Sequence, residues 1–135
     1  MHSQRIDPEA LPLYDSGVKA GFPSPAEDEI AIPLNLNTHL IPHPSSTFFI
    51  RALGDSMQGA GIFSGDILIV DKSLQASHGK IVVALIDGEF TVKRLMIQTE
   101  GVILQPENPQ YKPIYIRNYQ DLVIWGVVTY VIHKT

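Results

Sequence analysis

Two residues in this 135-residue chain have the types and the surroundings that a Ser-Lys hydrolase requires. Ser56 lies in the motif Gly54-Asp55-Ser56-Met57, directly after an apolar run, and Lys93 lies inside a second apolar run. A serine hydroxyl is a weak nucleophile until a base removes its proton, and an uncharged lysine can act as that base. Gly54, with Gly59 and Gly61 further on, would let the backbone turn tightly and expose the hydroxyl.

Lys93 belongs to the segment 89–95, which has the pattern of a β-strand. Because side chains alternate between the two faces of a strand, Lys93 shares a face with Thr91 and Leu95. A lysine that faces the interior of a site loses hydration, which lowers its pKa and favours the uncharged amine. Taken singly, each residue also has an ordinary interpretation: Ser56 as a loop serine bonded to a turn, and Lys93 as a solvent-facing lysine on a hairpin.

Other chemistries fit the sequence less well. The Gly-x-Ser-x-Gly elbow of the α/β-hydrolases requires a glycine where Gln58 stands. No spacing favours a Ser-His-Asp triad through His78. His39 and His43 have the spacing of a helical zinc site, but the prolines on either side of His43 oppose a helix, so we interpret both as loop histidines. The chain contains no cysteine and no phosphate-binding glycine loop, and we expect neither a metal nor a cofactor.

The elements that would position this pair are short strands. Four prolines between residues 1 and 28 oppose a helix there and predict an extended N-terminal arm. Strand patterns follow at 30–34, 47–53, 67–71, 80–86, 89–97, 101–105, 115–116 and 122–132. Asp87-Gly88 is a hairpin turn signal, and Gly126 marks a bulge or bend in the last strand. The sequence predicts a mostly β single domain of curved antiparallel sheets with an extended N-terminal arm.

Composition narrows the classes of function. The net charge is −4, and the basic residues are scattered, so we expect no direct sequence-specific binding to nucleic acid. We find no apolar signal region at the N-terminus and no stretch long enough to span a membrane. We therefore expect a cytoplasmic protein without a membrane anchor.

Several short motifs, in order and spacing, resemble the LexA-type self-cleaving serine peptidases over nearly the whole chain. They are Gly21-Phe22-Pro23-Ser24-Pro25-Ala26, His43-Pro44-Ser45, Gly54-Asp55-Ser56-Met57, Gly65-Asp66-x-Leu68-Ile69-Val70-Asp71, Ala76-Ser77-His78-Gly79, Asp87-Gly88-Glu89-Phe90-Thr91-Val92-Lys93 and Gly126-Val127-Val128. The resemblance implies the β fold that this family shares with signal peptidases. Signal peptidases, however, would also require the membrane anchor that we do not find.

The resemblance also assigns roles to residues. It implies that Ser56 is the catalytic serine, that Lys93 is the general base, and that the cleaved bond joins Ala20 to Gly21. The chain would then consist of a removable arm, residues 1–20, and a β-rich core, residues 21–135. An Ala-Gly bond is the version familiar from LexA repressors, and its small side chains suit a close approach to Ser56.

The segment before the cleaved bond indicates a branch of the family. Repressors carry a helix-turn-helix domain there, whereas only twenty proline-broken residues precede Gly21 here. The resemblance therefore implies an SOS mutagenesis protein. In that branch a RecA–single-stranded-DNA filament stimulates self-cleavage after DNA damage. The shortened form is then a homodimer that serves as accessory subunit of a UmuC-type translesion DNA polymerase.

Two other functions remain open from the sequence. One is a dimeric clamp module that keeps the fold and does not cleave. The other is a peptidase that acts on other proteins. Whether cleavage occurs within one chain or between two chains is also open.

Overall fold

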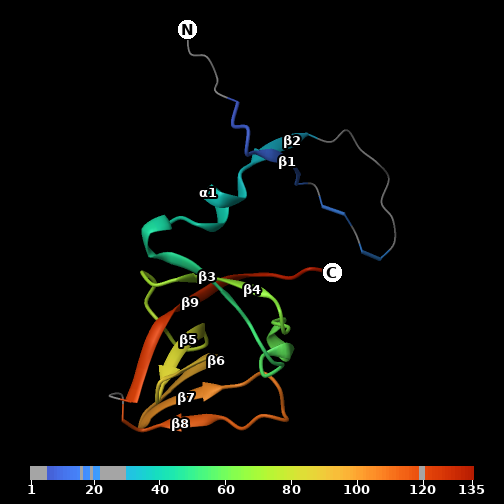
Figure 1. Ribbon diagram of the computed structural model, residues 1–135. Helices are drawn as coiled ribbons and strands as arrows, with labels where there is room; N and C mark the ends of the chain where they lie inside the picture. Colours follow the sequence, from blue (N-terminus) through green and yellow to red (C-terminus); the bar gives the residue numbers. More distant parts are fainter. Residues whose placement is uncertain (1–5, 16, 19, 22–29, 119–120) are drawn as a thin grey trace. The chain divides into compact units, whose positions relative to one another are not determined.

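The computed structural model describes residues 6–15, 17–18, 20–21, 30–118 and 121–135, and the chain forms two compact units, Met1–Pro42 and His43–Thr135. In the first unit β1 (Leu11–Tyr14) pairs antiparallel with β2 (Ala31–Leu34), and a short helix α1 (Leu36–Leu40) follows (Figure 1). The strand predicted at 30–34 is confirmed. Strand β1 was not predicted and falls where we expected only an extended arm. Helix α1 was not predicted either.

The second unit contains one sheet of seven antiparallel strands, which confirms the predicted mostly β fold. Its strands are β3 (Thr47–Arg51), β4 (Ile67–Asp71), β5 (Ile81–Ile86), β6 (Glu89–Gln98), β7 (Gly101–Gln105), β8 (Ile114–Ile116) and β9 (Leu122–Ile132). Their order across the sheet is β3-β4-β9-β5-β6-β7-β8. The long final strand β9 thus lies between β4 and β5 and joins the two halves of the sheet (Figure 1).

The hairpin that carries Lys93 turns as the sequence predicts. Asp87 has a φ of 49° and Gly88 a φ of 80°, so both central residues of the β5–β6 turn adopt the left-handed conformation. Two positive φ values in succession are the requirement of the type I′ turn, whose twist matches that of the flanking strands. The turn fixes the register in which Lys93 lies opposite Val82.

Strand β9 is irregular next to Gly126, as predicted for a bulge. Val83 pairs with Gly126 and Ala84 with Ile124, so Trp125 is the extra residue. A Cβ at position 126 would lie 2.6 Å from Val70 Cγ1 and 3.2 Å from the Asp71 carbonyl oxygen. Glycine is therefore required by the close approach of β4.

We predict that Gly126→Ala lowers the free energy of unfolding by about 1–3 kcal/mol, because the added methyl group overpacks the fully buried Val70. Chemical denaturation followed by circular dichroism measures this loss. The control is Val123→Ala, at a half-exposed position on the same strand, which should cost less. Equal stability of Gly126→Ala and the wild type would contradict the packing argument.

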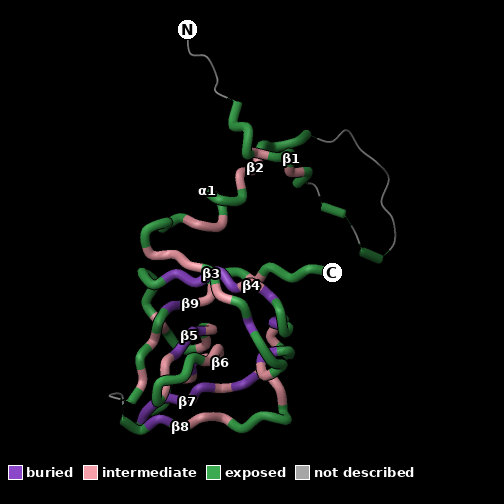
Figure 2. The backbone as a smooth tube through the Cα atoms, viewed as in Figure 1, coloured by how far each residue is buried: buried purple, intermediate pink, exposed green. Residues whose placement is uncertain are grey.

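The core of the second unit consists of two apolar clusters, and their residues are among the buried, purple segments of Figure 2. The members of the first are Val82, Ala84, Leu95, Val102, Leu104, Ile116 and Val127. Those of the second are Ala52, Met57, Ile62, Leu68, Val70 and Val83. Met57 directly follows Ser56, so burial of its side chain anchors the serine segment to the sheet.

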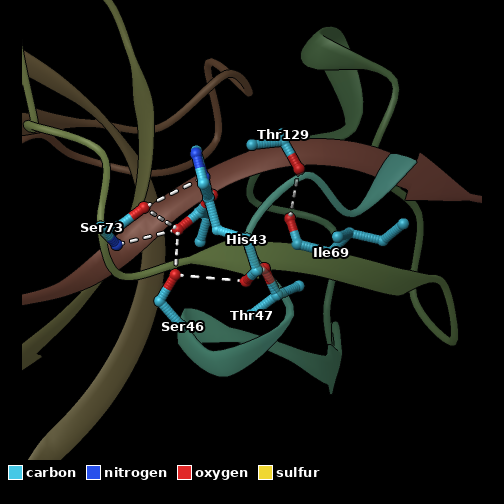
Figure 3. A network of polar contacts seen from close by, with 7 residues as sticks. His43, Ser46, Thr47, Ile69, Ser73 and Thr129 are labelled. Atoms are coloured by element: carbon cyan, nitrogen blue, oxygen red, sulfur yellow. Dashed lines mark hydrogen bonds and ion pairs between the residues drawn. The ribbon is translucent and has the colours of Figure 1, made fainter. Parts of the chain in front are cut away.

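Polar side chains gather around Asp71, the last residue of β4 (Figure 3). The buried carboxylate of Asp71 accepts hydrogen bonds from the Ser46 hydroxyl at 3.0 Å and from the Ser73 hydroxyl at 2.6 Å and amide at 2.8 Å. The His43 ring lies 2.7 Å from the same carboxylate, through Nδ1. Burial alone would raise the pKa of Asp71, but these hydrogen bonds outweigh it and hold the pKa well below its ordinary value.

This network predicts an acid-labile contribution to stability. A carboxylate whose pKa is lowered by folding stabilises the folded state above the unfolded pKa, about 3.9, and the benefit disappears as the pH falls toward the folded pKa. Asp71→Asn should therefore lower the unfolding temperature at pH 7 by on the order of 5 °C and flatten its decline below pH 4. Thermal unfolding between pH 7 and pH 3 measures both effects. If the unfolding temperature of Asp71→Asn fell below pH 4 as steeply as that of the wild type, Asp71 would not be the source of the acid-labile stability.

Candidate active site

The structure brings the predicted serine and lysine together. Lys93 Nζ lies 3.0 Å from Ser56 Oγ, although the two residues are 37 positions apart. Strand β6 supplies the lysine, and the loop between β3 and β4 supplies the serine. Both side chains are partly buried.

Lys93 lies in surroundings that disfavour its charge. Burial lowers the pKa of Lys93 below the ordinary lysine value. Its Nζ also lies 2.8 Å from Thr91 Oγ1 and 3.0 Å from the Val92 carbonyl oxygen. No carboxylate within the described ranges forms an ion pair with Lys93, so no anion there restores the charged form.

The serine loop presents unpaired amides beside the hydroxyl. Gly54 and Gly61 adopt left-handed φ values of 84° and 82°, which the tight turns around Ser56 require. Within the described part of the chain, the amides of Ser56 and Met57 donate to no acceptor. Such amides can stabilise an oxyanion that forms at the serine.

A pocket of about 240 Å³ opens beside the pair. Ser56, Met57, Thr91 and Lys93 contribute to its lining. The remaining lining residues are mainly apolar: Ile50, Ala52, Leu53, Ile62, Val83, Phe90 and Val92, with Arg51 and Gly54. A pocket of this kind fits an extended peptide segment with small or apolar side chains.

The bond predicted to be cleaved lies in the first unit. Ala20 and Gly21 are both exposed, and a Cβ at position 21 would have no heavy atom within 4 Å. Their neighbours in the motif, residues 22–26, lie outside the described residues. Cleavage at this bond stays a prediction.

The histidines lie apart from the pair. His39 lies on α1, contrary to its interpretation as a loop residue, because the helix ends at Leu40, ahead of the proline that we expected to oppose it. His43 belongs to the Asp71 network, and His78 accepts a hydrogen bond from the Ile97 amide at 2.8 Å. Across the described residues, no three His, Cys, Asp or Glu side chains form a group that could hold a metal ion.

Two features of the site were not predicted as functional. Thr91 contacts the lysine amine, and strand alternation had already placed it on the same face as Lys93. The loop after β7 binds the serine loop: the Glu107 amide donates to the Ser56 carbonyl at 2.8 Å. No local pattern signals this contact, because it joins segments distant in sequence.

A family model described as Peptidase S24-like matches residues 12–129, and the chain belongs to this family. The mostly β fold of the chain agrees with this family, which is a family of self-cleaving serine peptidases. The longest helix among the described residues has five residues, so no described helix is long enough to cross a membrane.

Relatives define the type within the family. Protein ImpA of Escherichia coli is 46% identical over 131 residues, which cover 96% of this chain and 88% of ImpA. Protein SamA of Salmonella typhimurium strain LT2 is 48% identical over 124 residues, 92% of this chain and 86% of SamA. The LexA repressor of Anaeromyxobacter dehalogenans is 40% identical over 119 residues, 87% of this chain but only 52% of the repressor. ImpA and SamA are UmuD homologues, and this chain is likewise a UmuD-type protein of the SOS mutagenesis family.

Proposed function

We propose that this UmuD-type protein cuts its own chain between Ala20 and Gly21 with Ser56 as nucleophile and Lys93 as general base. The observation that carries the proposal is the 3.0 Å distance between Lys93 Nζ and Ser56 Oγ at a partly buried lysine. The cut divides the chain into a removable arm, residues 1–20, and a core, residues 21–135. Membership of a self-cleaving peptidase family supports the same chemistry.

The contacts of Lys93 fit an uncharged amine. Such an amine has two N–H donors and one lone pair. The Val92 carbonyl can only accept a hydrogen bond, and the Thr91 hydroxyl accepts a second. The lone pair is then free to receive the proton of the Ser56 hydroxyl, the arrangement that a general base requires.

The reaction follows from this arrangement. Ser56 Oγ attacks the carbonyl carbon of Ala20 as Lys93 takes the hydroxyl proton. The free amides of Ser56 and Met57 stabilise the oxyanion. Lys93 then returns the proton to the amine of Gly21, which leaves, and water hydrolyses the ester on Ser56.

We predict that self-cleavage of the isolated chain accelerates as the pH rises and then levels off. The rate follows the fraction of uncharged Lys93, whose pKa is lowered by burial, so the midpoint lies below about 10.4, the value for exposed lysine. Intact-mass measurements between pH 7 and pH 11 check this, with a product that begins at Gly21. An unchanged mass at every pH would instead favour a dimeric clamp that does not cleave.

The cellular role that we propose is that of the UmuD type. In the cytoplasm, a RecA–single-stranded-DNA filament stimulates the cut. The shortened form pairs as a homodimer and joins a UmuC-type translesion DNA polymerase. Family membership and the likeness to ImpA and SamA support this role. Activated RecA should accelerate the mass change at neutral pH, whereas cleavage of an unrelated Ala-Gly peptide would favour a peptidase that acts on other proteins.

A further inference from the structure

The loop that follows β7 holds the serine loop through its backbone. The Glu107 amide donates to the Ser56 carbonyl at 2.8 Å, and the Gly59 amide donates to the Glu107 carbonyl at 2.7 Å. A Cβ at position 59 would lie 2.6 Å from that same carbonyl oxygen, so only glycine permits the approach. Glu107 thus binds the serine loop at the nucleophile and again three residues later.

Two side chains of the same loop form hydrogen bonds to Asp55, the residue before the serine. Asn108 Nδ2 donates to the Asp55 carbonyl at 2.9 Å. The Tyr111 hydroxyl donates to the Asp55 carboxylate. With the Glu107 contacts, these bonds restrain the backbone on both sides of Ser56.

An ion pair connects this loop to the strand that carries the lysine. Arg94 Nε donates to Glu107 Oε1 at 2.6 Å, and Arg94 also donates to the Gly79 carbonyl at 2.6 Å. Both side chains of the pair are about 30% exposed, so the pair is partly shielded from water. Arg94 directly follows Lys93 on β6, and successive strand side chains point to opposite faces. One strand therefore reaches the Ser56 hydroxyl through Lys93 and the Ser56 carbonyl through Arg94 and Glu107.

We propose that Arg94 and Glu107 are positioning residues that hold the Ser56 hydroxyl at reacting distance from the Lys93 amine. The inference rests on the proposed function of Ser56 and Lys93. Neither residue touches the reacting atoms; each acts through the backbone of Ser56. Misplacement of a reacting group by about 1 Å can cost on the order of 10²-fold in rate, so this tie affects the reaction even where folding is preserved.

The test compares Glu107→Gln, Arg94→Gln and the double variant in the full chain. Glutamine has the shape of glutamate, so Glu107→Gln leaves the two backbone bonds in place and removes the charge. Glu100→Gln and Arg117→Gln change the same charges at exposed positions and serve as matched controls. Two rates are measured at temperatures where circular dichroism shows each variant folded. One is the plateau rate of self-cleavage at alkaline pH, and the other is the rate at which a fluorophosphonate labels Ser56.

We expect each single variant to lower both rates by about 10- to 100-fold, while the controls keep the wild-type rates. The double variant should be no slower than the slower single variant, because both substitutions break the same connection. A simple structural ion pair would lower the unfolding temperature and leave both rates of the folded protein unchanged. That result, or additive losses in the double variant, would overturn the proposal.

A Ser56→Ala chain distinguishes failure of the positioning role from failure of the proposed self-cleavage. Cleavage that persists in Ser56→Ala overturns the proposed function itself. Cleavage and labelling that vanish in Ser56→Ala but stay at wild-type rates in Glu107→Gln and Arg94→Gln overturn only the positioning role.

Discussion

Replacing Lys93 with alanine is expected to lower the rate of self-cleavage at alkaline pH by about 10³-fold or more. The substitution removes the base that takes the Ser56 proton, a contribution typically of 10²- to 10⁴-fold, and it also removes the proton donor for the leaving amine. Intact-mass measurements over a time course give the rate. A product beginning at Gly21 that forms at the wild-type rate would contradict the assignment of the base.

Lys93→Arg is the matched control for loss of packing. Arginine retains a long cationic side chain but stays protonated throughout the accessible pH range, so it cannot act as a base. We expect it to be as inactive as Lys93→Ala. Lys80→Ala, which removes an exposed lysine just ahead of β5, should keep the wild-type rate.

A bulky side chain at the cleaved bond is the second substitution with a large expected effect. Ala20→Trp or Gly21→Trp should slow cleavage by at least about 10²-fold, because the ring keeps the carbonyl carbon away from Ser56 Oγ. Both positions are exposed, so the unfolding temperature should not change. Mass measurement of the products and thermal unfolding check the two expectations. A product cut at another bond would show that the cleavage site is misassigned.

The strands could be predicted because their signals are local. Short apolar runs bounded by turn residues placed β4, β7 and β9 at the observed residues. Strand β1 was missed because Leu11–Tyr14 contains a proline and has no apolar period, and its pairing with β2 depends on residues about twenty positions away. Helix α1 was missed because five residues are too few to show a helical period, although Asn35 accepts the N-capping bond from the Asn37 amide.

The site was predictable only in part. Strand alternation placed Thr91 and Lys93 on one face, and the glycines around Ser56 indicated tight turns. The contact between Ser56 and Lys93 depends on the sheet order, which no local pattern encodes. The family resemblance predicted that the two residues act together, whereas their spacing alone did not. The Arg94–Glu107 connection has no such signal at all, because an ion pair between β6 and a loop is visible only once the strands are in register.

Because β1 and β2 lie on opposite sides of the proposed cut, cleavage would make their pairing depend on concentration. While the chain is intact, the two strands are joined by the segment between them, and their pairing is favoured by a high effective concentration. After cleavage between Ala20 and Gly21 the strands would belong to separate molecules, and their pairing would depend on peptide concentration. The two strands form a separate sheet with only four residue pairs, and an isolated two-stranded pairing is at best marginally stable in water. Dilution would then release the peptide and make an otherwise reversible strand separation permanent.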